Sequence, residues 1–207
     1  ENMEKVEFVP HPTKQIEEFK ERANGKYIHK KGIKYYYKEY KDNINFKDGY
    51  DYEFDAVRFC HPPLCLIDAY NTIEERYLVS IDADVEIREK IPEDFFPSLV
   101  RENCYTHYLS RAPHKHMESG FIIWDTHHLI HGSWWREYKR LYEDNGIFDI
   151  KEGWTDCHAF DFVNDRLELS NPGVENHKIA DRQSHDVWAI SPLQKYLTHK
   201  KGTTISI

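Results

Sequence analysis

The sequence predicts an α/β fold in which a mixed, mostly parallel β-sheet is flanked by helices. Short runs of β-branched and aromatic residues alternate along the chain with longer segments of helical periodicity, which is the order typical of such folds. The most informative stretch covers residues 77–86, where a run of strand-forming residues ends in two aspartates, Asp82 and Asp84. We interpret residues 77–81 as a buried central strand of a parallel sheet.

The bulk composition is that of one globular domain. The chain has 207 residues, which is enough to build a full hydrophobic core. No run of 18 apolar residues is present, so no membrane span is expected, and the charged first twenty residues do not resemble a signal peptide. Because the chain begins at Glu1 without an initiator methionine, we treat residues 1–207 as a single domain that is trimmed or excised from a longer chain.

The cysteines point to a reducing compartment. Cys60, Cys65, Cys104 and Cys157 show no C-x-x-C pairing, so we expect reduced thiols and a cytoplasmic location. A zinc site formed by Cys60, His61 and Cys65 is an alternative, but the second pair of ligands that such sites need is absent.

Charge is unevenly distributed along the chain. The formal net charge is −8, and residues 51–177 carry 25 acidic against 12 basic side chains. An acidic body argues against a protein that holds nucleic acid through many phosphate contacts. Residues 178–207 carry five basic against two acidic side chains, which suits one small polyphosphate or simply a solvated terminus.

Four elements are expected before the aspartates. Residues 4–9 alternate like a strand, and residues 13–24 have a helical stripe that starts at the N-cap candidate Thr13. Residues 26–51 are rich in Lys and Tyr and are expected to form an irregular excursion or a short edge hairpin. Residues 54–71 predict a buried helix that begins near Asp55 and is kinked or restarted at Pro62-Pro63. Because only fragments of a first strand–helix–strand unit precede this helix, either the excursion replaces that unit or part of the N-terminal nucleotide-binding unit is missing.

The elements expected after the aspartates alternate between helices and strands. The last helix has Ser191 as its N-cap and Pro192 at its first position. In chain order we expect a short helix near 92–100, strands at 105–109 and 121–124, helices at 128–145 and 156–167, and the last helix at 193–198.

Asp82 and Asp84 are the first candidates for chemistry. Residues i and i+2 of an extended chain point to the same side, so both carboxylates would converge at the carboxyl end of the strand. Two hard oxygen donors suit Mg²⁺ or Mn²⁺ shared with phosphate oxygens, and burying them without a cation would be costly. The alternative is a solvated turn.

Three further stretches carry polar side chains of catalytic type. The loop at 111–120 ends in Glu118-Ser119-Gly120, Asp156 opens a helix, and His199 precedes two lysines. Each has a structural alternative: Asp156 is also a good helix N-cap, and His199 also suits the C-terminal end of a helix.

Taken together, these stretches resemble metal-dependent glycosyltransferases of the GT-A type, particularly small ones encoded by large DNA viruses and tailed phages. The resemblance covers about Phe54 to Gly202. It rests on Phe54-Asp55-Ala56-Val57-Arg58-Phe59, Asp82-Ala83-Asp84, Glu118-Ser119-Gly120-Phe121, the set Trp154, Asp156, Phe160 and Asp161, and the set Ser191, Leu193, Tyr196, His199, Lys201 and Gly202.

The resemblance implies a GT-A-like (Rossmann-like) fold and a nucleotide-sugar donor, most often a UDP-sugar, bound through Mn²⁺ or Mg²⁺. It implies Asp82, Asp84 and His199 as metal ligands and Asp156 as the catalytic carboxylate on the acceptor or sugar side. The donor would be held by Arg58, Asp82, Ala83, Glu118, Ser119, Gly120, Lys200, Lys201 and Gly202.

The acceptor is expected to be a hydroxyl on a glycan or glycoprotein. A viral origin would also allow a hydroxymethylated DNA base, which the acidic body makes less favoured, and it would place the protein in the host cytoplasm. Two other functions compete: a metal-dependent phosphoesterase or nuclease, which would use several further His and Asp residues, and a non-catalytic carbohydrate-binding module, which would not need the aspartates.

Overall fold

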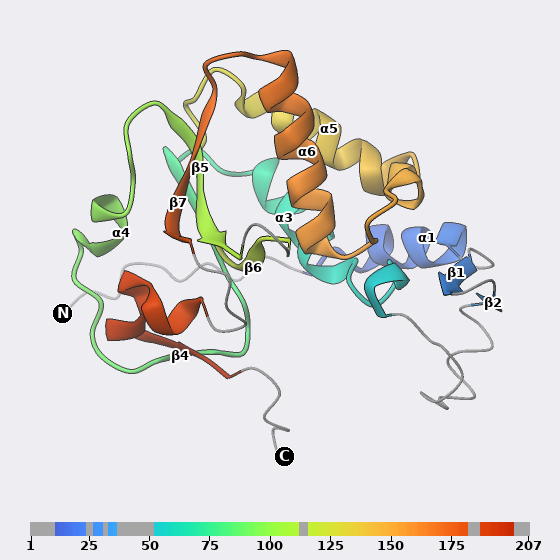
Figure 1. Ribbon diagram of the computed structural model, residues 1–207, viewed down its shortest axis with the longest axis horizontal. Helices are drawn as coiled ribbons and strands as arrows, with labels where there is room; N and C mark the ends of the chain where they lie inside the picture. The colour runs from blue at the N-terminus through green and yellow to red at the C-terminus, as the bar shows by residue number, and fades with distance from the viewer. Residues whose placement is uncertain are drawn as a thin grey trace. The chain divides into compact units, whose positions relative to one another are not determined.

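The computed structural model describes residues 11–23, 27–30, 33–36, 52–111, 116–181 and 187–200 (Figure 1). The chain divides into two compact units. The first contains Glu1–Ile73 and Lys139–Thr155, and the second contains Glu74–Tyr138 and Asp156–Ile207.

The first unit is built around helix α1 (Thr13–Ala23), whose buried face consists of Ile16, Phe19 and Ala23. This spacing is the helical stripe that the sequence predicted, so the helix is confirmed. Strands β1 (Tyr27–Lys30) and β2 (Ile33–Tyr36) form an antiparallel hairpin, in agreement with the hairpin alternative for this region. The predicted strand at 4–9 lies outside the described residues.

Helix α3 (His61–Tyr70) starts later than predicted. Residues 52–54 form the 3-10 helix η2 (Tyr52–Phe54), and Arg58 lies in a turn rather than on a helix. The prolines explain the difference: Pro62 and Pro63 occupy the first turn of α3, where backbone amides have no intrahelical partner and proline costs little. The prolines therefore begin the helix and do not kink it.

The second unit contains a four-stranded sheet in the order β3-β6-β5-β7, formed by Tyr77–Ile81, Glu118–Asp125, Cys104–Ser110 and Glu175–Asp181. β3 and β5 both run antiparallel to β6, and only the β5–β7 pair is parallel. The mixed α/β class is confirmed, but the prediction of a mostly parallel sheet is wrong for the described residues. The short connection at 111–117 makes β5 and β6 antiparallel neighbours, because parallel neighbours need a longer crossover.

Strand β3 was predicted to be buried and central, and this is also wrong. It stands at one end of the described strand order and its side chains are partly exposed. The two inner strands are β6 and β5, and every residue of β6 except Ser119 is buried. The continuous apolar run of β6 from Phe121 to Trp124 is what burial on both faces requires.

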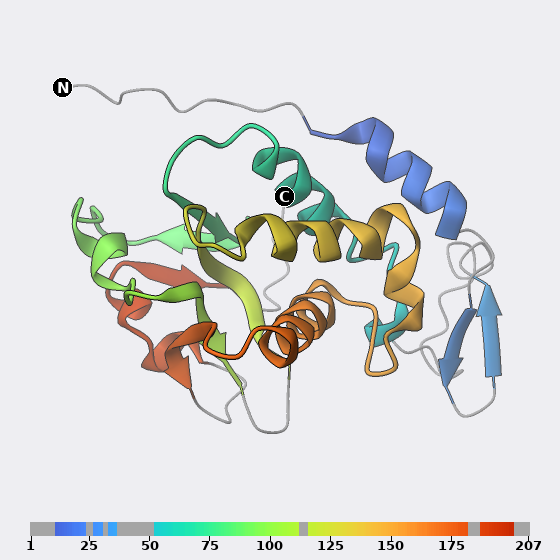
Figure 2. The ribbon, with the colours of Figure 1, turned by 90° about the horizontal axis from the view of Figure 1, so that it is seen from above.

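Elements cover both faces of this sheet (Figure 2). Trp124 packs against Trp134 of helix α5 (His131–Glu143) and Phe160 of helix α6 (Asp156–Ser170). Phe121, on the opposite face of β6, packs against Phe96 and Trp188. These two belong to α4 (Phe95–Ser98) and the 3-10 helix η4 (Trp188–Ile190).

Helices α5 and α6 confirm the predictions for 128–145 and 156–167, and β5 and β6 confirm the predicted strands. The last predicted helix is right in its start, with Ser191 at the N-cap position and Pro192 in the first turn, but wrong in its extent. The chain forms the 3-10 helix η5 (Pro192–Lys195) and then strand β8 (Leu197–His199), which pairs antiparallel with β4 (Val85–Ile87). The hydroxyl of Ser191 donates to the Trp188 carbonyl and does not cap a helix.

Candidate metal centre

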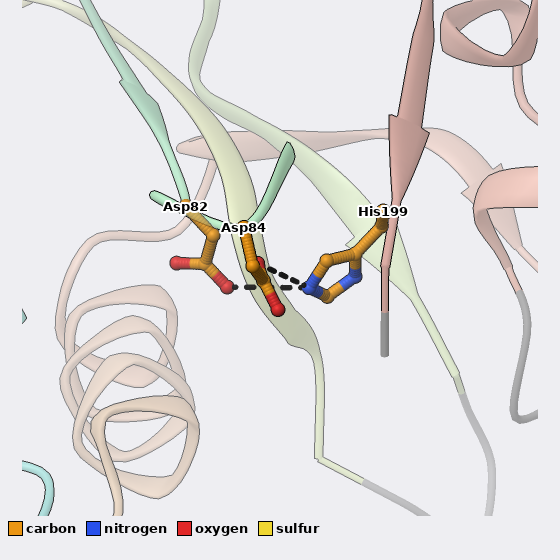
Figure 3. Close-up of side chains that lie close together, drawn as sticks. All are labelled: Asp82, Asp84 and His199. Carbon is orange, nitrogen blue, oxygen red and sulfur yellow. Dashed lines mark ion pairs between the residues drawn. The ribbon is translucent and has the colours of Figure 1, made fainter. Parts of the chain in front are cut away.

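Asp82, Asp84 and His199 gather at one place, although more than 110 positions separate the histidine from the aspartates in the sequence (Figure 3). His199 Nε2 lies 3.0 Å from Asp84 Oδ1 and 3.7 Å from Asp82 Oδ2. One ligand atom from each of the three residues lies within 4.8 Å of the other two. The structure thus brings together the three side chains that the sequence nominated as metal ligands.

Backbone pairing explains this convergence. The chain leaves β3 after Ile81 and turns, with the Val85 amide donating to the Asp82 carbonyl over 3.1 Å. It then enters β4, where Val85 is paired with His199 of β8. The Lys200 amide also donates to the Asp84 carbonyl over 3.2 Å. The small β4–β8 sheet therefore holds His199 beside the two aspartates.

The donor set suits a divalent cation. Ligands about 2.1 Å from an octahedral ion are about 3.0 Å apart when adjacent and about 4.2 Å apart when opposite. The two distances from His199 Nε2 to the aspartate oxygens, 3.0 Å and 3.7 Å, fall in this interval. Asp84 Oδ1 is buried and meets His199 Nε2 at 3.0 Å without the geometry of a hydrogen bond, and His199 Nδ1 is buried with no hydrogen-bond partner. Burial of a carboxylate oxygen without a well-formed hydrogen bond is costly, and a cation between Asp84 and His199 would remove that cost. Three protein ligands leave positions for phosphate oxygens or water.

Gly120 is required by its distance from Asp82. The Asp82 amide donates to the Gly120 carbonyl over 3.0 Å, so the two backbones run side by side. A Cβ atom on residue 120 would lie 2.9 Å from Asp82 Oδ2 and 3.3 Å from Glu118 Oε1. The absence of a side chain at residue 120 therefore leaves the room that the Asp82 carboxylate occupies.

Glu118 is buried and its charge is matched by Arg111. Glu118 is only 4% exposed and Arg111 only 8% exposed, and Arg111 Nη1 lies 3.4 Å from Glu118 Oε2. The guanidinium also donates to the carbonyls of His116 and Met117. Sequence reasoning noted the polar loop that Arg111 opens but assigned this arginine no role; no local pattern distinguishes it from a solvated loop residue.

Asp156 and Ser119 contact one another next to Gly120. The Ser119 hydroxyl hydrogen-bonds the Asp156 carboxylate, and the Cys157 amide donates to Asp156 Oδ1 over 3.0 Å. Burial raises the pKa of Asp156, and the Ser119 hydrogen bond partly opposes this increase. Asp156 is the first residue of α6 and Ser119 immediately precedes Gly120, so the chain links this pair to the metal-ligand group.

A second half-buried carboxylate, Asp161, stabilises the entry into β6. Asp161 Oδ2 accepts a hydrogen bond from the Met117 amide over 3.0 Å, and the Met117 carbonyl accepts one from the Arg111 guanidinium. Burial raises the pKa of Asp161 to about 7. Met117 is therefore held at both its amide and its carbonyl, directly before Glu118, Ser119 and Gly120.

Three more of the predicted donor-binding residues lie in the described ranges: Ala83, Lys200 and Arg58. Ala83 is exposed between the two aspartates, and Lys200 Nζ pairs with Glu86 Oε2 at 3.0 Å. Arg58 is exposed in the first unit, where its guanidinium lies 5.7 Å from the ring centroid of Phe59. Lys201 and Gly202 lie outside the described residues.

The alternative zinc site is not supported. Within the part of the chain that the structure describes, the one group of three metal-ligating side chains is Asp82, Asp84 and His199. All four cysteines are free thiols, and burial raises the pKa of Cys60 to about 11, which disfavours the thiolate that zinc requires.

The chain matches no protein-family model and no curated protein. None of the helices in the described ranges combines the length and the apolar character needed to cross a bilayer. What the site can do must therefore be argued from its own residues.

Proposed function

We propose that this chain is a metal-dependent glycosyltransferase of GT-A type that moves a sugar from a nucleotide-sugar, of the UDP-sugar class, to a hydroxyl on a glycan or glycoprotein. The observation that carries the proposal is the convergence of Asp82, Asp84 and His199 beside Gly120. The sequence motifs shared with such enzymes support the proposal, because Asp82 and Asp84 come from one of those motifs and His199 comes from another.

The chemistry of the donor fits these residues. The leaving group is a nucleoside diphosphate, whose charge increases as the glycosidic bond breaks. Asp82, Asp84 and His199 would hold Mn²⁺ or Mg²⁺, which supplies Lewis-acid stabilisation of that charge without a proton. The two carboxylates and the neutral imidazole form a set of hard and intermediate donors that suits these ions.

The neighbouring residues suit recognition of the sugar and the acceptor. Arg111 holds the Glu118 carboxylate, so that carboxylate can accept a hydrogen bond from a sugar hydroxyl without moving. The Asp156 carboxylate accepts from Ser119, and its raised pKa makes it a stronger base than an ordinary aspartate. We assign Asp156 the role of orienting or deprotonating a hydroxyl, and Ser119 the role of orienting Asp156.

The phosphoesterase or nuclease alternative is less favoured. Two-metal hydrolases use ligands for two ions about 3.5–4 Å apart. The described residues supply one group of three ligands, which is enough for one ion. A DNA acceptor is less favoured than a glycan because the formal net charge is −8.

Thermal unfolding with UDP, GDP, CDP and TDP, each with and without Mn²⁺, tests the proposal. A ligand at 100 times its dissociation constant adds about 2.7 kcal/mol, which for a chain of this size raises the melting temperature by roughly 5–10 °C. We expect such a rise for one nucleotide, UDP, and only with Mn²⁺.

Two variants make the test specific. Asp84→Asn removes a ligand charge at almost constant volume and should abolish the Mn²⁺-dependent rise. Glu89→Gln removes an exposed carboxylate five residues further along and should leave the rise intact. Stabilisation that persists in Asp84→Asn, or no rise for any nucleotide with the unchanged chain, would refute the proposed donor site. Release of phosphate from UDP by the unchanged chain would favour the hydrolase.

A further inference from the structure

The second ring nitrogen of His199 has an unusual environment for a metal ligand. His199 Nε2 faces the two aspartates, and Nδ1 is buried with no hydrogen-bond partner among the described residues. A ligating histidine almost always donates its other ring N–H to a carboxylate, a carbonyl or water, and this hydrogen bond fixes the ring orientation. In His199 another contact must provide that orientation.

Trp188 provides the contact. Its indole ring centroid lies 5.1 Å from the imidazole centroid of His199, with 48° between the planes. Trp188 is only 4% exposed, and its own Nε1 has no hydrogen-bond partner. Its interaction with His199 is therefore one of ring packing and not one of hydrogen bonding.

Core residues hold the Trp188 ring in place. Phe121 packs edge-on against the indole with centroids 6.2 Å apart, and Val187 and Leu193 belong to the same buried cluster. Trp188 Cζ2 also lies 3.3 Å from the position that a Cβ on Gly120 would occupy. The indole thus lies against both the backbone that contacts Asp82 and the imidazole of His199, and a change in its position would affect both.

We propose that Trp188 is a positioning residue for the metal centre, which orients the imidazole of His199 toward Asp82 and Asp84 by ring packing in place of a hydrogen bond to Nδ1. This inference rests on the proposed metal site. The His199–Asp84 contact cannot serve this purpose, because Nε2 must give up that contact in order to bind a cation. β8 has only three residues, so the backbone alone restrains the ring weakly.

Replacement of the ring should therefore weaken cation binding. Loss of a partner that orients a ligand typically costs about 10–100-fold in metal affinity. We expect this loss for Trp188→Leu, which removes the aromatic face, and recovery of most of the affinity in Trp188→Phe, which keeps one. Trp124→Leu is the matched control: Trp124 is 1% exposed, also has an unpartnered Nε1, and packs on the opposite face of β6.

The experiment is titration of the full chain with Mn²⁺ by calorimetry, together with the visible spectrum of the Co²⁺ form, which reports the geometry of the bound ligands. Support requires that Trp188→Leu, with an unchanged circular dichroism spectrum, binds Mn²⁺ about 10–100-fold more weakly and alters the Co²⁺ spectrum, while Trp124→Leu does neither. Should Trp188→Leu fail to fold, Trp188→Met replaces it, since its flexible unbranched chain adapts to the space left by the indole and has no aromatic face.

Two results count against the proposal and differ from one another. If the unchanged chain binds Mn²⁺ and Trp188→Leu binds it equally well with the same Co²⁺ spectrum, Trp188 has no positioning role but the metal site stands. If the unchanged chain binds neither ion, the metal site and the proposed function both fall.

Discussion

Substitution of Gly120 by alanine tests the geometry of the metal centre directly. The added Cβ would lie 2.9 Å from Asp82 Oδ2, whereas ordinary van der Waals contact begins at 3.4 Å, which is 0.5 Å longer. The Glu118 carboxylate and the Trp188 ring, each 3.3 Å from the same point, restrict movement of the methyl group away from Asp82. Asp82 must therefore move, and its carboxylate rotates out of line with His199.

The size of this displacement sets the expected effect. Metal–ligand distances are held within about 0.2 Å of their ideal values, so a shift of about 0.5 Å exceeds the tolerance of the site. We expect Gly120→Ala to weaken Mn²⁺ binding by about 10–100-fold, equivalent to about 1.4–2.8 kcal/mol. Because the displaced group is the end of a side chain and not backbone, we expect the free energy of unfolding without metal to fall by less than about 1.5 kcal/mol.

Calorimetric titration with Mn²⁺ and urea unfolding without metal measure the two effects separately. Gly132→Ala is the control, because a Cβ at residue 132 meets nothing within 4 Å. Gly132 lies in helix α5, so alanine there should raise the free energy of unfolding by up to about 1 kcal/mol and leave Mn²⁺ binding unchanged. A Gly120→Ala variant that binds Mn²⁺ as tightly as the unchanged chain would refute the contact between residue 120 and the ligand Asp82.

Three further predictions concern the surroundings of the site. Burial raises the pKa of Asp161 to about 7, so the folded state retains a proton that the unfolded state releases near pH 4, and the free energy of unfolding should fall as the pH rises through this interval. Asp161→Asn should remove this dependence and be about 1–3 kcal/mol more stable at pH 8 than the unchanged chain in urea unfolding. Asp165→Asn should weaken the dependence without removing it, because burial is the main cause of the raised pKa of Asp161 and the Asp165 charge only adds to it. Arg111→Met should lower the free energy of unfolding by about 3–5 kcal/mol in the same assay, because the Glu118 carboxylate is left buried without a counter-charge. Adding Glu118→Gln should restore part of this loss. Equal stability of the single and double variants would show that the ion pair is unimportant. His199→Gln should weaken Mn²⁺ binding and UDP binding together in calorimetry, and loss of neither would remove His199 from the site.

Local patterns in the sequence were sufficient for much of the fold. The stripe of Ile16, Phe19 and Ala23 predicts α1, and the apolar run from Phe121 to Trp124 predicts the core of β6, because periodicity and burial are properties of consecutive residues. The two aspartates after a strand also identified the candidate metal ligands. The rule used for that prediction, that residues i and i+2 of an extended strand share a side, does not describe the structure, because the chain turns at 82–85 and the turn brings the two carboxylates together.

Those local patterns did not predict which strands pair with one another. The apolar residues of β3 fit the edge of an antiparallel pair as well as the centre of a parallel sheet, since periodicity does not specify the neighbouring strand. The segment at 197–199 continued a helical pattern that began at Pro192, but pairing with β4 overrides that preference and makes it a strand. Strand β7 carries no strong alternation and was not predicted.

The sequence by itself determined which residues are chemically able to bind a cation and where the main helices lie, because both follow from residue type and local spacing. Only the tertiary structure decided that His199 reaches Asp84 through the β4–β8 pair, that Arg111 neutralises Glu118, and that Trp188 lies against both His199 and Gly120. Each of these contacts joins residues that are separated along the chain. These contacts form only when the whole unit packs, so no local pattern of residues predicts them.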